Sequence, residues 1–297
     1  MLRTNRRIPA NTCHGVAASK LIPDMLPRRT CIGVFDSGFG GLTVLKALLE
    51  VIPDADYIYF GDTARLPYGS KSVETVSRYA VQAGNYLEQH GAQMLVIACN
   101  TATALSLDKI TQAASVPVIG VVEPGAERAA GESKNRRAVV IGTEATVNSH
   151  AYLKALEARG VQAKEKACPL LVPLVEEGWT DHAVTEEVAR IYLDEAFTDG
   201  FRSADVLLLG CTHYPLLKPL LHRVASKHVT IVDSAESTAQ AVARELRHAP
   251  LAVPENERRN LPRLRFFATD STEKFKRLGE RFLGHKIEQV EHVDLKE

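Results

Sequence analysis

The sequence lacks any apolar run long enough to cross a membrane. A spanning helix needs about 20 apolar residues, whereas the most apolar runs of this 297-residue chain, such as VLLLGC at 206–211, have the length of a strand. A surplus of one charge is also missing, because 36 Lys and Arg residues balance 36 Asp and Glu residues. Since a broad nucleic-acid footprint needs excess Lys and Arg on one face, we predict no nucleic-acid partner, no membrane contact and a small ligand.

Cysteine is scarce, and its spacing suits neither disulfides nor metal. The five cysteines form no CxxC motif, and an odd number without that spacing fits neither a disulfide framework nor a structural zinc site. We therefore expect reduced thiols, no bound metal and a cytoplasmic location. The five are Cys13, Cys31, Cys99, Cys168 and Cys211.

The first 30 residues are basic, poor in acidic residues and without the apolar core of a secretory signal. We expect a disordered leader here; an organelle transit peptide and a true start at Met25 are the alternatives, which an intact-mass measurement separates. The remaining length exceeds what one hydrophobic core usually supports. We therefore expect two lobes, the first formed by residues 31–123 and 234–297 and the second by residues 124–233.

Short β-branched runs alternate with amphipathic stretches of helical length from residue 31 onward, which is typical of parallel βαβ units. The fold class expected is α/β, with two similar lobes of mostly parallel sheet, pseudo-symmetric about a central cleft. A polar linker is expected at 249–262. Strands are expected at 31–35, 56–62, 93–98, 137–143 and 204–210, and helices at 42–52, 72–90 and 147–160, with another beginning near Thr101.

Cys99 and Cys211 occupy equivalent places in the two halves. LVIACNT and LLLGCTH each consist of an apolar run, a small residue, Cys and a hydroxyl or amide residue, which predicts a Cys at the carboxyl end of a strand, where ligands bind in open α/β sheets. A base and an acid on opposite sides of an α-carbon can move its hydrogen between faces, and thiols titrate close enough to neutrality for both tasks. Because free Cys is often buried, two core residues are the alternative interpretation, which we adopt for Cys31 and Cys168.

Polar residues beside apolar runs are further candidates. The loop DSGFGG at 36–41 lies between a strand and a helix, where backbone N–H groups can bind an anion; a tight connection is the alternative. It is not a dinucleotide fingerprint, because Thr43 stands at the third glycine position of GxGxxG.

His213 lies two residues after Cys211 and suits a proton partner. Asp36 and Glu176 are either site carboxylates or helix caps and surface charges.

Six motifs resemble those of glutamate racemases, the bacterial enzymes that supply D-glutamate for peptidoglycan. The resemblance runs from about Ile32 to Val293 and implies cofactor-independent racemisation of L-glutamate to D-glutamate by a homodimer. The motifs, in the family's order, are GVFDSGFGGLTV, YFGDTARLPYG, CNTAT, PLVEEGW, LLLGCTHYPLL and FFATDS.

The resemblance also implies roles for individual residues. Cys99 and Cys211 become the proton-transfer residues, with Asp36 near the first thiol and with Glu176 and His213 near the second. Glu177, next along the chain, is an alternative to Glu176. Substrate contacts are implied for Asp36, Ser37, Tyr68, Gly69, Asn100, Thr101, Thr212 and His213, and less strongly for Thr143 and Thr146.

Two other functions share parts of this pattern. An aspartate or hydantoin racemase would use the same pair of thiols, and racemisation assays on L-glutamate and L-aspartate separate it from a glutamate racemase. A non-catalytic amino-acid-binding protein would also have two α/β lobes around a cleft. Such a binder would leave the α-hydrogen in place in D₂O, whereas a racemase would exchange it for deuterium.

Overall fold

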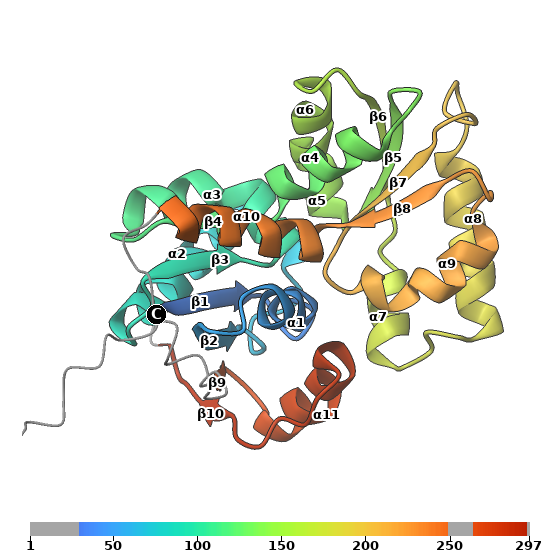
Figure 1. Cartoon of the computed structure of the whole chain (residues 1–297). Helices are drawn as coiled ribbons and strands as arrows, with labels where there is room; N and C mark the ends of the chain where they lie inside the picture. Colours follow the sequence, from blue (N-terminus) through green and yellow to red (C-terminus); the bar gives the residue numbers. More distant parts are fainter. Residues whose placement is uncertain (1–29, 249–263, 296–297) are drawn as a thin grey trace, which may run out of the picture.

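The structure is a computed structural model that describes residues 30–248 and 264–295. The strands of these residues form two separate sheets, drawn in Figure 1, and all their pairings are parallel. The expected leader, except for Thr30, and the expected linker at 249–262 lie outside the described residues.

The first sheet has six strands in the order β10-β9-β2-β1-β3-β4. Strand β1 lies between β2 and β3, with Phe35 opposite both Phe60 and Ile97. It is buried along almost its whole length, as is typical of a parallel strand covered on both faces. The strands are β1 Cys31–Asp36, β2 Asp56–Gly61, β3 Met94–Ile97, β4 Val118–Gly120, β9 Leu264–Ala268 and β10 Glu291–His292.

The second sheet repeats part of the first. Its order, β6-β5-β7-β8, corresponds strand for strand to β2-β1-β3-β4. Cys99 and Cys211 therefore follow equivalent strands, β3 and β7. This arrangement confirms the predicted α/β fold with two similar parallel sheets. The strands are β5 Arg137–Gly142, β6 Gln162–Ala167, β7 Val206–Gly210 and β8 Thr230–Asp233.

Helices cover both sheets, and one apolar core joins them. That core extends from Val34 in β1 to Leu207 in β7, and α10 packs against both α1 and α4 (Figure 1). The α-helices are α1 Leu42–Val51, α2 Val73–Gln89, α3 Asn100–Ala113, α4 Val122–Glu132, α5 Glu144–Ser149, α6 Ala151–Glu157, α7 Leu171–Glu176, α8 Ala183–Ala196, α9 Lys218–Val224, α10 Ser234–His248 and α11 Thr272–Leu283, with 3-10 turns η1 Tyr68–Ser70 and η2 Tyr214–Leu217.

The single helix predicted at 147–160 was wrong. Two helices, α5 and α6, meet at His150, whose backbone adopts a left-handed conformation with φ of 55°. The Oγ1 of Thr143 accepts a hydrogen bond from the Thr146 N–H and starts α5 earlier than expected. The imidazole Nδ1 of His150 lies 2.8 Å from Glu165 Oε2 in β6, so a contact with the sheet accompanies the break.

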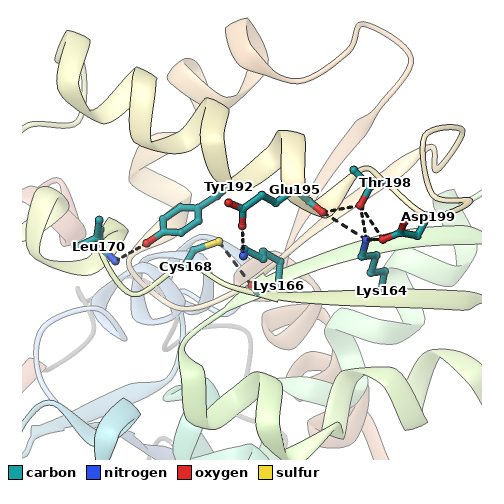
Figure 2. Close-up of polar contacts among 8 residues, drawn as sticks. All are labelled: Lys164, Lys166, Cys168, Leu170, Tyr192, Glu195, Thr198 and Asp199. Atoms are coloured by element: carbon teal, nitrogen blue, oxygen red, sulfur yellow. Dashed lines mark hydrogen bonds and ion pairs between the residues drawn. The ribbon is translucent and has the colours of Figure 1, made fainter.

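Strand β6 forms one edge of the second sheet, and α8 together with the residues that follow it makes polar contacts with this strand (Figure 2). Lys164 Nζ lies 3.0 Å from Asp199 Oδ2, and Lys166 pairs with Glu195. Cys168, just beyond the strand, is fully buried, and its Sγ lies 3.6 Å from the Lys166 carbonyl oxygen. Burial raises the pKa of this thiol to about 12, which agrees with its interpretation as a core residue.

Candidate active site

A cavity of about 200 Å³ lies between the two sheets and is lined by residues of both. Its polar side chains follow strand ends: Ser37 after β1, Cys99 after β3, Thr143 after β5 and Cys211 after β7. This is the edge at which parallel sheets bind ligands. Eleven of the expected residues line the cavity, and Asp36 and Thr146 do not: the eleven are Ser37, Tyr68, Gly69, Cys99, Asn100, Thr101, Thr143, Glu176, Cys211, Thr212 and His213.

Cys99 caps the helix that begins at the cavity. Its Sγ accepts a hydrogen bond from the Ala102 N–H at 3.4 Å and donates toward Ser37 Oγ at 3.5 Å. Burial, followed by the nearby charge of Asp36, raises the pKa of this thiol to about 12, although the Ala102 N–H and Ser37 act in the opposite direction. The environment of Cys99 therefore favours the protonated thiol at neutral pH.

Asp36 ends β1 beneath the cavity and is 1% exposed. Its Oδ2 accepts a hydrogen bond from the Gly38 N–H at 2.9 Å, while Oδ1 has no hydrogen-bond partner among the described residues. Burial raises the pKa of this carboxyl, despite the lowering effect of His213 and of backbone N–H groups. Ionised Asp36 is thus costly, and its charge acts on the Cys99 thiol and on His213.

Cys211 has a different neighbour, an imidazole paired with a carboxylate. His213 Nδ1 lies 3.9 Å from Cys211 Sγ, and its Nε2 lies 3.2 Å from Glu176 Oε1. Burial acts to lower the pKa of His213, but hydrogen bonds and charge interactions with Cys211 and Glu176 together outweigh burial and raise it to about 10. Burial also acts to raise the pKa of Glu176, but the hydrogen bond to His213 and the positive charges of His213 and Lys274 together outweigh it and lower that pKa overall. Glu177 is exposed, so Glu176 is the carboxylate that contacts His213.

Two residues of α11 contact His213 and its partner Glu176. The ring of Phe282, in α11, meets the imidazole edge-on with centroids 5.1 Å apart, and Arg281 donates to the Glu176 carbonyl oxygen at 3.3 Å. A Cβ at Gly40 would lie 2.2 Å from Thr212 Oγ1 and 2.6 Å from His213 Nδ1. Glycine is therefore required at position 40 because the DSGFGG loop touches the Cys211 side of the cavity.

The wall that joins the two halves is rich in hydroxyls. Thr101 Oγ1 lies 2.9 Å from Thr143 Oγ1, which lies 2.9 Å from Thr146 Oγ1. Tyr68 lines the cavity, but its hydroxyl donates to Asp62 Oδ2 at 2.5 Å. The threonine hydroxyls of this wall can bind the carboxylates of a small ligand.

Sequence reasoning missed three residues that hold the site together. Asp62 is fully buried and accepts the hydroxyl of Tyr68, Phe282 packs on His213, and Tyr152 binds Asn100. Of these three, only Asp62 could have been singled out from the sequence, because it is an acidic residue directly after an apolar strand. In the described ranges no cluster of three or more His, Cys, Asp or Glu residues could hold a metal, and no helix is long and apolar enough to cross a membrane.

Comparisons with known proteins give consistent matches. A family model for the Asp/Glu/hydantoin racemases matches residues 32–242. A glutamate racemase of Koribacter versatilis is 58% identical over 290 residues, which cover 91% of this chain and 99% of that protein. The crystal structure of a Bacillus anthracis glutamate racemase isoform superposes with a TM-score of 0.83 at 38% identity, covering 90% of this chain and 98% of the other.

A second solved structure, the glutamate racemase of Francisella tularensis in complex with D-glutamate, has a TM-score of 0.81 at 34% identity over 90% of this chain and 98% of its own. The residues that the family model matches include every residue that lines the cavity. These findings confirm the resemblance carried by the six motifs. The chain is therefore an enzyme of the Asp/Glu/hydantoin racemase family.

Proposed function

We propose that this enzyme interconverts L- and D-glutamate without a cofactor and so supplies D-glutamate for peptidoglycan synthesis. The observation that carries the proposal is that one cavity is lined by two thiols, Cys99 and Cys211, which follow equivalent strands of two similar sheets. The relatives named above are glutamate racemases, and one of them was solved with D-glutamate. Both lines of support point to amino-acid racemisation with glutamate as substrate.

The reaction proceeds by proton transfer through the α-carbon. Protonated His213 faces Cys211 and stabilises a thiolate there, and this thiolate removes the α-hydrogen as a proton. The electron pair left behind delocalises into the α-carboxylate, and the Cys99 thiol then delivers its proton to the opposite face. The reaction ends with Cys211 as the thiol and Cys99 as the thiolate. Proton exchange with solvent then returns Cys211 to the thiolate and Cys99 to the thiol.

The remaining site residues orient the substrate and tune these two thiols. Asp36 acts beside Cys99, and Glu176 acts on Cys211 through His213. The hydroxyl, amide and backbone groups around the cavity bind the ammonium group and the two carboxylates, which keeps the α-carbon between the sulfurs. The proposed substrate contacts are Ser37, Tyr68, Gly69, Asn100, Thr101, Thr143, Thr212 and His213, which line the cavity. Asp36 and Thr146, which do not line it, act through Cys99 and Thr143.

The cleft is formed by two lobes in this account. Residues 31–123 and 234–297 form the first, and residues 124–233 form the second. The division is supported by the sheets, because β5 to β8 form one sheet while strands on both sides of them along the chain form the other. The homodimer and the cytoplasmic location stay predictions.

A polarimetric assay tests the proposed activity. Purified protein with no added cofactor should abolish the optical rotation of L-glutamate and leave that of L-aspartate unchanged. Loss of rotation with aspartate alone would make the enzyme an aspartate racemase. No racemisation of either, with the α-hydrogen retained in D₂O, would leave only an amino-acid-binding role.

A further inference from the structure

Tyr152, in the half of the molecule that holds the second sheet, contacts the cavity residue Asn100. It belongs to α6, and its hydroxyl donates to Oδ1 of Asn100, the first residue of α3, at 2.6 Å. Tyr152 is fully buried, and Asn100 lines the cavity while only 3% exposed. The other end of the amide, Nδ2, is buried without a hydrogen-bond partner among the described residues. The structure thus pairs a satisfied acceptor with an unused donor on one side chain.

The direction of the hydrogen bond determines which end of the amide is free. An asparagine side chain has one accepting and one donating end of nearly the same shape, so it can turn over unless a neighbour selects one end. Ser234 also hydrogen-bonds the oxygen of Tyr152, and burial raises the pKa of the phenol well above its usual value. Tyr152 therefore stays protonated and its proton is available to Asn100 Oδ1.

The packing leaves little freedom for this tyrosine. A Cβ at Gly125 in α4 would lie 3.3 Å from the Tyr152 hydroxyl and 3.2 Å from the Cβ of Ser234. Ser234 begins α10, just after β8, where the chain leaves the second sheet. The hydroxyl thus joins three elements, α3, α6 and α10, at the side of the cavity.

We propose that Tyr152 is a positioning residue for substrate binding, which locks the Asn100 amide so that Nδ2 donates to a carboxylate oxygen of the bound amino acid. The proposal rests on the proposed function, because it takes Asn100 as a substrate contact. Its action is on binding, since a fixed donor to a carboxylate is used by both enantiomers and by the intermediate between them. The alternative is that Tyr152 is only a packed aromatic side chain of the second half.

The test compares Tyr152→Phe with a matched tyrosine outside the cavity. Tyr57 is also buried, and its hydroxyl donates to the carbonyl oxygens of Leu48 and Ile52. We expect Tyr152→Phe to raise KM about tenfold for both enantiomers, the effect of one hydrogen bond to a charged group, while kcat changes less than about twofold. Tyr57→Phe should leave KM unchanged even where it lowers the melting temperature.

A double-mutant cycle with Asn100→Ala sharpens the result. Because Tyr152 acts through Asn100, the double variant should have the KM of Asn100→Ala alone, within about twofold. Independent effects that multiply would overturn the proposal, as would an unchanged KM in Tyr152→Phe or an equal rise in Tyr57→Phe. Should Tyr152→Phe fail to fold, Ser234→Ala removes the second partner of the hydroxyl; a KM raised about two- to threefold supports the proposal, and an unchanged KM overturns it.

The wild-type assay separates the two possible failures. Normal racemisation by the wild type together with an unchanged KM in Tyr152→Phe would remove only the role of Tyr152. A wild type that racemises no amino acid would remove the proposed function, and the positioning role would fall with it.

Discussion

The two thiols follow equivalent strands, but their surroundings differ in charge. Cys99 lies near a buried carboxyl, and burial together with that charge raises its pKa to about 12. Cys211 lies 3.9 Å from an imidazole whose pKa is raised to about 10. A buried carboxyl therefore acts on one sulfur, whereas an imidazole with a raised pKa lies beside the other.

In the proposed mechanism, this difference lets one repeated strand order supply an acid and a base of the same residue type. The strands set the positions of the sulfurs, while residues distant in sequence set the charges around them. The raised pKa of His213 depends in part on its hydrogen bond to Glu176. Its ring packs against Phe282, which belongs to α11 near the end of the chain. Substitutions on the Cys99 side of the cavity and on the Cys211 side should therefore have different effects on activity and stability.

The largest expected effect comes from removing either thiol. Cys99→Ser and Cys211→Ser should each slow racemisation by about 10²–10⁴-fold, because a serine hydroxyl is a far weaker acid than a thiol. Each variant should still exchange the α-hydrogen of one enantiomer with solvent deuterium, and that enantiomer should differ between the two variants. Proton NMR of each enantiomer in D₂O measures this.

Cys31→Ser is the control, because Cys31 is a half-buried thiol that does not line the cavity. It should racemise glutamate at the wild-type rate. Exchange of the same enantiomer by both site variants would mean that the sulfurs do not face opposite sides of the substrate.

An intermediate effect is expected from the carboxylate behind His213. Activity should fall as pH rises through about 10, where His213 loses its proton. Glu176→Gln removes a partner that raises this pKa, so the alkaline limb of the kcat/KM profile should move down by about one to two pH units. Glu177→Gln, an exposed neighbour, should leave the limb in place; equal shifts in both variants would contradict the assigned contact.

The smallest effect concerns stability on the Cys99 side. The pKa of Asp36 is raised by burial, so the folded protein holds this proton more tightly than the unfolded chain does. Stability due to this group is present below its usual pKa and is lost as pH rises toward its folded value. Asp36→Asn should therefore stabilise the protein at pH 7, because the amide removes the cost of a buried charge, although racemisation falls.

Urea unfolding at pH 5 and pH 8 measures this gain. The exposed Asp108→Asn serves as the control and should show no gain. A destabilised Asp36→Asn at pH 8 would mean that the ionised carboxylate is favoured in the folded protein.

The sequence predicted those features that depend on local pattern. Helix α2 begins after Ser72, which caps it, and Gly91 with φ of 99° follows its end, as the residue types indicate. The apolar runs before Cys99 and Cys211 also sufficed to place both residues after strands. The break at His150 was not predictable, because the apolar periodicity continues across it and Glu165 contacts it from another strand.

Contacts between site residues distant in the chain could not be predicted from the sequence for the same reason. Tyr152 and Asn100 are 52 positions apart, and Phe282 meets His213 from α11. Periodicity shows which face of an element is buried but not which side chain of another element lies against it. Their hydrogen bonds and ring contacts need coordinates.

The most direct test follows the α-hydrogen during the first few per cent of conversion in D₂O. Two bases on opposite faces predict that newly formed D-glutamate carries deuterium at the α-carbon, while the recovered L-glutamate remains unlabelled. The same pattern should hold in the reverse direction. Equal labelling of substrate and product at early times would show one base serving both faces, and that result would contradict the account.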